Sequence, residues 1–88
     1  MDSLQDLRQQ IDQLDIKIID LLSQRAARTK NIGQLKPKDN NKRDPEREQE
    51  VLANVKTLNK GPLSQESVQQ IYQAIMRACR ELQEENQA

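Results

Sequence analysis

The first third of the chain carries a repeating apolar pattern that constrains the fold more than any other feature. Leu or Ile occupies positions 4, 11, 18 and 32 of one seven-residue series and positions 7, 14, 21 and 35 of a second. Apolar residues that alternate at spacings of three and four mark one face of an α-helix. The missing members of the two series are both cations, Arg25 and Arg28. The pattern therefore predicts a long helix whose apolar seam changes character towards its end.

This helix is too long for a compact domain of its own. We expect it to end near Lys36, because Pro37 disfavours helical geometry in the residue before it and the following PKDNNK is typical of a loop. About 33 residues at ~1.5 Å each give a rod of roughly 50 Å, whereas a compact chain of this length has a radius of gyration of about 12 Å. A second apolar stripe also runs along the rod, formed by Ile16, Ile19, Leu22 and Ala26. The simplest cover for the projecting stripes is a second copy of the chain in a symmetric dimer.

The sequence predicts a second helix after the loop. Asp44 can cap the free amides at its start, and Pro45 suits the first helical position. Gly61 and Pro62 stop the helix. Its apolar stripe consists of Val51, Leu52, Val55 and Leu58.

A third helix follows, with Ser64 as its cap. We expect it to fade into the polar tail EENQA, and no segment has the alternation of a strand. Its apolar stripe consists of Val68, Ile71, Tyr72, Ile75, Met76, Cys79 and Leu82. The predicted fold class is therefore all-α, with three helices in a single domain over residues 1–88 and an intertwined homodimer.

Composition supports a partner chain and excludes several kinds of site. The 88 residues are 34% apolar with Tyr72 as the only aromatic residue, so one chain can build only a thin core. Fourteen basic and fourteen acidic residues cancel, so no overall field favours nucleic acid or an anionic membrane. The absence of His makes a zinc site improbable and removes the commonest general base. The lone Cys79 and the absence of a signal peptide or long apolar run favour a reducing cytoplasm.

Several polar side chains stand on or beside the apolar stripes of all three helices. For any single one, the simpler interpretation is that its stem lies on apolar surface while its polar end stays in water; Glu48 could pair with a nearby cation, and Gln83 could belong to a frayed tail. Taken together, they indicate a cationic pocket between the helices that binds a small ligand with two carboxylates. The set is Arg8, Arg25, Lys36, Arg47, Glu48 and Gln83.

Nucleophilic catalysis is poorly supported, because Ser64 and Ser67 have no His nearby and Cys79 has no base. A phosphate ligand is less favoured than a carboxylate, because no Gly-rich loop opens a helix.

The sequence resembles a known family. The segments LRQQIDQLDIKIIDLLSQRA, NIGQLK, RDPEREQEVL and IMRACRELQ, in that order and spacing, resemble the all-helical (AroQ-type) chorismate mutases over nearly the whole chain. The resemblance implies an intertwined homodimer of three-helix chains with two identical sites, each lent one arginine by the other subunit. Arg28 stands where the family usually has an apolar residue.

The resemblance also implies roles for the cations. Arg8 would be the residue lent across the interface, and Arg25 would bind a substrate carboxylate beside it. Lys36 would reach the ether oxygen and a carboxylate, while Arg47 would add positive charge.

The remaining implied roles belong to residues of the second and third helices. Asp44 and Glu48 would meet the ring hydroxyl through backbone or carboxylate. Cys79 matches a position that is often small and polar in the family. Gln83 would donate to the ether oxygen.

The implied reaction is the rearrangement of chorismate to prephenate, in the shikimate route to phenylalanine and tyrosine. It needs no proton transfer, nucleophile, metal or cofactor, which agrees with the residue inventory. Cations would hold the flexible arm over the ring, and Lys36 and Gln83 would meet the charge that grows on the ether oxygen. Two alternatives stay open: an isochorismate pyruvate lyase of the same fold, and a non-catalytic helical dimerisation module.

Overall fold

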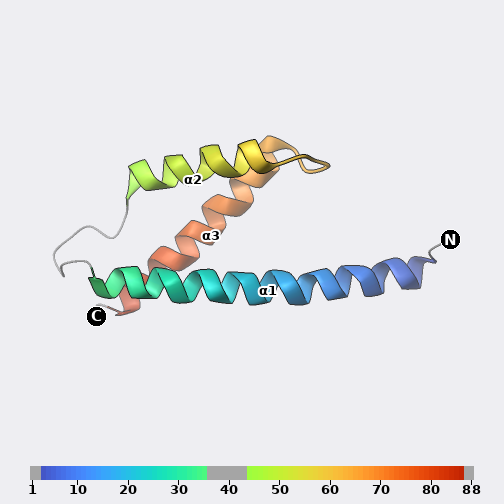
Figure 1. Ribbon diagram of the computed structural model, residues 1–88, viewed down its shortest axis with the longest axis horizontal. Coiled ribbons are helices and arrows are strands. Elements are labelled where there is room, and N and C mark those ends of the chain that lie inside the picture. The colour runs from blue at the N-terminus through green and yellow to red at the C-terminus, as the bar shows by residue number, and fades with distance from the viewer. Residues whose placement is uncertain (1–2, 36–43, 87–88) are drawn as a thin grey trace.

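The chain folds into three helices (Figure 1). The computed structural model describes residues 3–35 and 44–86, with side chains as far as Leu82. Helix α1 spans Leu4–Leu35, α2 spans Pro45–Leu58 and α3 spans Gln65–Asn86. These ranges contain no strand. The predicted all-α class, with its long N-terminal helix, is confirmed.

Helix α1 begins with a capping arrangement and ends where the loop was predicted. The Ser3 hydroxyl accepts a hydrogen bond from the Asp6 amide at 3.1 Å, and the Ser3 amide donates to the Asp6 carboxylate at 3.3 Å. This reciprocal pair satisfies amides that have no partner within the helix. The helix then runs for 32 residues without interruption.

Helix α2 is delimited by side chains at both ends. The Asp44 carboxylate accepts from the Arg47 amide at 3.1 Å, and Pro45 takes the first helical position, as predicted. At the other end the Asn59 amide nitrogen Nδ2 donates to the Leu63 carbonyl at 2.8 Å and to Gln65 Oε1 at 3.0 Å. Asn59 therefore ties the end of α2 to the start of α3.

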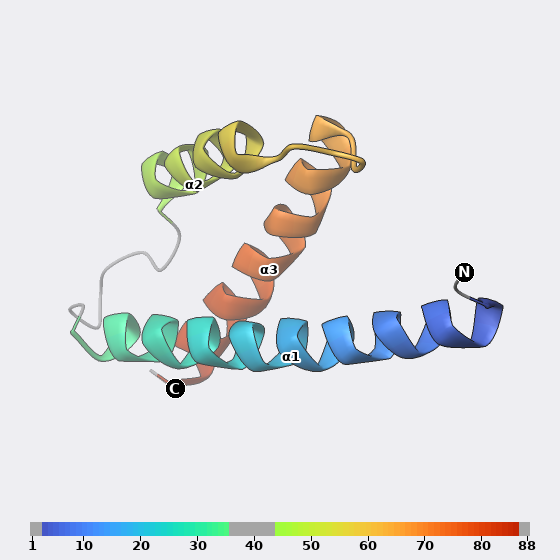
Figure 2. The same cartoon turned by 45° about the vertical axis from the view of Figure 1, so that its right-hand side comes forward.

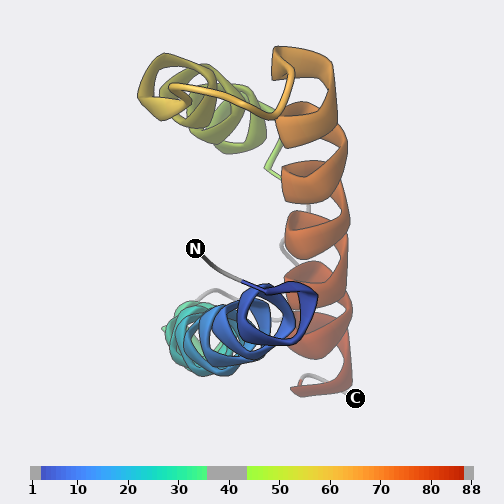
Figure 3. The same cartoon turned by 90° about the vertical axis from the view of Figure 1, so that its right-hand side faces the viewer.

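Helix α3 links the other two helices. It packs against both α1 and α2, whereas α1 and α2 do not pack against each other within the described residues. Figures 1 and 2 show α3 running obliquely between them, with α2 near its beginning and α1 near its end. Figure 3 shows α1 and α2 on the same side of α3. The buried apolar side chains of this arrangement are Leu52, Val68, Met76 and Cys79.

The N-terminal half of α1 extends away from the rest of the chain (Figure 1). The molecule measures 57 × 24 × 14 Å, and its radius of gyration of 16.2 Å exceeds the roughly 12 Å of a compact chain this long. Every apolar seam residue from Leu4 to Leu21 is at least 45% exposed. These residues are Leu4, Leu7, Ile11, Leu14, Ile18 and Leu21. The chain thus leaves the predicted seam uncovered by its own residues.

Helix α3 ends within the polar tail EENQA, into which the sequence pattern predicted that it would fade. Its last helical residue is Asn86. Glu and Gln favour helical geometry almost as well as Ala, so a polar tail can prolong a helix that packing has already started. Over the described residues, none of the three helices combines the length and apolarity that a membrane span requires.

We expect Asn59→Ala to lower the free energy of unfolding by about 1–2 kcal/mol, because it removes the side chain that bridges α2 and α3. For a domain of this size the melting temperature should fall by roughly 4–8 °C per kcal/mol. Thermal unfolding followed by circular dichroism measures the change. Asn54→Ala, on the exposed surface of α2, is the matched control. Equal melting temperatures for the two variants would contradict the bridging role of Asn59.

Candidate functional site

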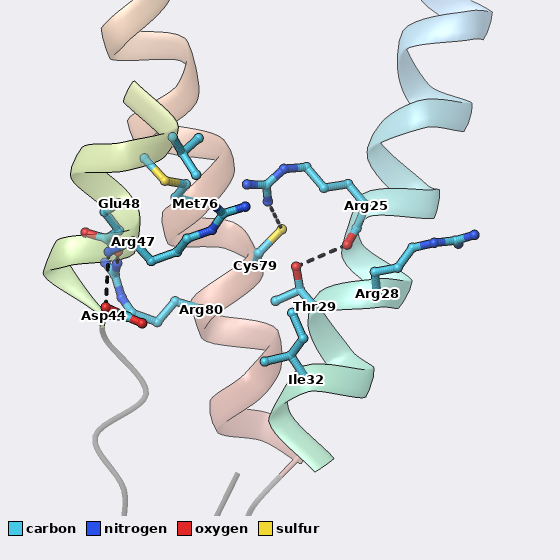
Figure 4. Close-up of a pocket in the computed structure, with 11 residues that line it drawn as sticks. Arg25, Arg28, Thr29, Ile32, Asp44, Arg47, Glu48, Met76, Cys79 and Arg80 are labelled. Atoms are coloured by element: carbon cyan, nitrogen blue, oxygen red, sulfur yellow. Dashed lines mark hydrogen bonds and ion pairs between the residues drawn. The ribbon is translucent and has the colours of Figure 1, made fainter. Parts of the chain in front are cut away.

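A pocket of about 470 Å³ lies between the three helices (Figure 4). The second half of α1, the first turns of α2 and the second half of α3 contribute its walls. Thr29, Ile32, Val51, Met76 and Cys79 supply its uncharged surface. Its charged lining residues are Arg25, Arg28, Asp44, Arg47, Glu48 and Arg80.

Arg25 faces the pocket and meets α3. Its Nη1 donates to the Sγ of the buried Cys79 at 3.3 Å, and Figure 4 shows the two side chains reaching towards each other. Thr29, one turn further on, donates its hydroxyl to the Arg25 carbonyl at 3.1 Å. The guanidinium has further N–H groups besides the one on sulfur, because Arg carries five donors in a fixed fork. Arg25 is therefore held inward in a geometry that suits a carboxylate ligand.

Arg28 lines the same pocket but has a different orientation. Figure 4 shows its side chain pointing away from α3, opposite to Arg25. Its Nη1 donates to the carbonyl of Gln24 in its own helix at 3.4 Å, and the residue is exposed. The two cations that interrupt the apolar seam thus differ in where their charges lie.

The start of α2 supplies three charged residues to the pocket. Asp44 uses a carboxylate oxygen to cap the helix through the Arg47 amide. The Arg47 guanidinium is paired with Glu50 in its own helix, and both side chains are 61% exposed. Glu48 forms an ion pair with Arg80 of α3, with 2.6 Å between Oε2 and Nη1. The Glu48 and Arg80 side chains are only 20% and 24% exposed, so this pair lies inside the wall of the pocket.

Arg80 is a pocket residue that the sequence reasoning missed. The signal was present, because Arg80 follows the apolar Met76 by four residues. Gln83 was predicted as a site residue from the same spacing, because it follows Cys79 by four residues. The sequence offered a neighbouring cation as one possible partner of Glu48, and that partner is Arg80 of α3.

The structure does not bring every predicted site residue into the pocket. Arg8 lies on α1, 17 residues before Arg25, which corresponds to roughly 25 Å along the helix. Lys36 lies outside the described residues. Gln83 belongs to α3 one turn beyond Cys79, but its side chain is also outside them. Of the predicted set, Arg25, Asp44, Arg47, Glu48 and Cys79 line one pocket.

The lining of the pocket favours an anion. Arginines outnumber carboxylates in it by four to two, and the Arg25 side chain is the one that faces inward to Cys79. Within the part of the chain that the structure describes, no group of three or more His, Cys, Asp or Glu side chains could hold a metal ion. Neutralisation of a bound anion therefore falls to the arginines among these residues.

Comparison with known proteins identifies similar chains. The family described as chorismate mutase type II matches residues 7–84. The bifunctional chorismate mutase/prephenate dehydratase of Aquifex aeolicus (strain VF5) is 40% identical over 88 residues, which cover 94% of this chain and 24% of the relative. The protein of the same name from Stutzerimonas stutzeri is 37% identical, over 94% of this chain and 24% of the relative. The one from Neisseria gonorrhoeae is 43% identical, over 82% of this chain and 20% of the relative. The chain therefore spans a quarter or less of the length of each of these relatives.

We expect Arg28→Leu to leave the function of the pocket intact and to raise the melting temperature. Among the described residues the Arg28 guanidinium is hydrogen-bonded within its own helix, whereas leucine would restore the apolar seam that Leu21 and Leu35 continue on either side. Arg25→Leu is the matched control and should abolish function, because it removes the inward-facing cation. Loss of function in Arg28→Leu comparable to that in Arg25→Leu would contradict the distinction between the two seam arginines.

Proposed function

The chain belongs to the chorismate mutase type II family, and we propose that it catalyses the intramolecular rearrangement of chorismate to prephenate. The observation that carries the proposal is the pocket in which Arg25 of α1 and Cys79 of α3 meet among further arginines. Residues 7–84, which match the family, include every charged residue that lines this pocket. The similar proteins are named as chorismate mutases with a second activity, prephenate dehydratase, and the matching region makes up about a quarter of their length.

The charge of the pocket suits this substrate. Chorismate carries two carboxylates, and arginines outnumber carboxylates in the lining of the pocket by four to two. Arg25 would bind one carboxylate through the guanidinium N–H groups that Cys79 does not use. A substrate held at both carboxylates has lost most of its rotational freedom before it reacts. This reduces the entropic part of the barrier, which can amount to several kcal/mol in well-oriented intramolecular reactions.

The second part of catalysis is electrostatic. As the carbon–oxygen bond of the ether breaks, negative charge grows on the ether oxygen. Lys36 and Gln83 are proposed to donate to this oxygen, and Gln83 belongs to the α3 turn that follows Cys79. Donors aimed at charge that develops only in the transition state accelerate the step without tightening binding of the ground state. No nucleophile, proton transfer or cofactor enters this mechanism.

The site is proposed to be completed by a second copy of the chain. The exposed seam on the first half of α1 offers a continuous apolar surface to such a copy. Arg8 lies on that half, roughly 25 Å from the pocket of its own chain. In an intertwined homodimer, Arg8 of the partner subunit would bind a substrate carboxylate beside Arg25. The proposal also takes residues 1–88 as one catalytic domain and locates it in the cytoplasm, in keeping with its single cysteine.

A direct assay tests the proposal. Purified protein and chorismate at neutral pH should lose the ultraviolet absorbance of chorismate and give prephenate as the only new product. Formation of pyruvate from isochorismate, without prephenate from chorismate, would instead support a lyase of the same fold. No rate above background with either substrate at micromolar enzyme would leave the non-catalytic dimerisation module as the better account.

We expect Lys36→Ala to lower kcat by about 100-fold or more while the oligomeric state stays unchanged, because removal of one donor to a developing oxyanion typically costs this much. Steady-state kinetics and size-exclusion chromatography measure the two effects. Lys30→Ala, an exposed position of α1, is the control for loss of a lysine charge. A kcat for Lys36→Ala equal to that of Lys30→Ala would remove Lys36 from the catalytic role.

We expect mixed Arg8→Ala and Arg25→Ala chains to recover activity that neither variant has alone. Each hybrid dimer would contain one site with both arginines, so random exchange of subunits should restore about a quarter of wild-type activity. Subunit exchange is followed by mass spectrometry of the mixed species. Hybrid dimers that form without any gain in activity would show that the two arginines do not serve one shared site.

A further inference from the structure

We propose that Arg80 is a positioning residue of this site, which orients the Glu48 carboxylate to accept a hydrogen bond from the ring hydroxyl of the substrate. The inference rests on the proposed function. It assigns a role to a residue that neither the sequence pattern nor the family resemblance singled out.

The first support is the contact itself. Arg80 Nη1 and Glu48 Oε2 are 2.6 Å apart, and the pair joins α3 to α2. Both side chains are about three-quarters buried or more. A charged hydrogen bond of this length, sheltered from water, restricts the rotation of the carboxylate more than an exposed ion pair would. Among the described residues α3 is the helix that packs against α2, and Arg80 is the α3 residue that holds the Glu48 carboxylate.

The second support is the location of the pair in a wall between two cavities. Glu48, Arg80 and Met76 line the pocket and also a neighbouring cavity of about 440 Å³ on the other side of the α2–α3 contact. That cavity is polar, with Gln49, Gln70, Gln73 and Arg77 in its lining. A Glu48 carboxylate released from Arg80 could turn towards those amides or towards Arg77. The ion pair keeps the carboxylate in the wall that the substrate pocket shares.

The third support is the balance of charge. Without Arg80 the Glu48 carboxylate would lose the cation that it is paired with in the wall of the pocket. A substrate with two carboxylates would then meet a less compensated like charge, and like charges at close range repel. With Arg80 in place, the negative charge of Glu48 is balanced inside the wall. An ionised carboxylate has roughly four acceptor sites, so it can serve both the arginine and a hydroxyl.

The experiment compares two ligands. We would measure kcat/KM for chorismate, and the competitive inhibition constant of an analogue that lacks the ring hydroxyl, in the full-length chain. Arg80→Met keeps the apolar stem and removes the charge, Arg80→Lys keeps the charge without the fork, and Arg77→Met removes a neighbouring exposed arginine of the same helix as the control. Glu48→Gln and the Glu48→Gln/Arg80→Met double variant complete the set, and thermal unfolding monitors the fold of each.

The proposal expects an effect specific to the hydroxyl. Arg80→Met should lower kcat/KM for chorismate by about ten- to a hundredfold, while the affinity for the analogue changes by less than about threefold. Arg80→Lys should recover part of the loss, and Arg77→Met should behave as wild type. Because Arg80 acts through Glu48, the double variant should be no worse than Glu48→Gln alone.

Two results would overturn the inference. One is an equal loss for chorismate and the analogue in Arg80→Met, which would indicate a general charge or folding effect. Another is a double variant in which the two losses multiply. Should Arg80→Met not fold, Arg80→Lys decides by the same comparison of ligands. An inactive wild-type protein would instead refute the proposed function, so the two failures are distinguishable.

Discussion

The structure depends on a mismatch of length between α1 and the rest of the chain. α1 runs for 32 residues, whereas α3, the helix that packs against it among the described residues, meets it only towards its C-terminal end. Seam residues such as Leu4 at 65% and Leu14 at 55% exposure are left in solvent, and exposed apolar area of this kind favours association. The buried core is correspondingly small, with Leu52 and Cys79 among its few members. Stability and site assembly are therefore both expected to come from a second chain.

The same mismatch explains where the pocket lies. α3 packs against both α1 and α2, but α1 and α2 do not pack against each other within the described residues. The space between the three helices is therefore a pocket and not a packed core. Side chains that reach into this space come from different helices and meet across it, as Arg25 does with Cys79 and Arg80 with Glu48. Charged groups in such a wall are stabilised by partners or by a bound ligand. The crossing of the three helices thus explains why charged side chains from different parts of the chain gather around one pocket.

Local patterns in the sequence were sufficient to predict the three helices, but they did not predict which charged side chains form pairs. The seam and the loop after Lys36 predicted α1, and the Asp44 cap predicted the start of α2. Arg25 could be assigned to the pocket because it interrupts an apolar seam. The Arg80–Glu48 pair could not be predicted, because it depends on the angle at which α3 crosses α2. The end of α3 could be predicted only to within the tail EENQA, since polar residues such as Glu and Gln are compatible with a tail and with a helix.

The central claim is that each site combines the arginine pocket of one chain with Arg8 of a second chain around a dicarboxylate. A crystal structure of the protein with a stable dicarboxylate mimic of the bicyclic transition state tests it most directly. The account predicts one carboxylate on Arg25 and Arg8 of the partner subunit, and the ring hydroxyl on Glu48, with Arg80 still paired to it. A mimic bound elsewhere, or bound in this pocket by residues of one chain only, would contradict the account.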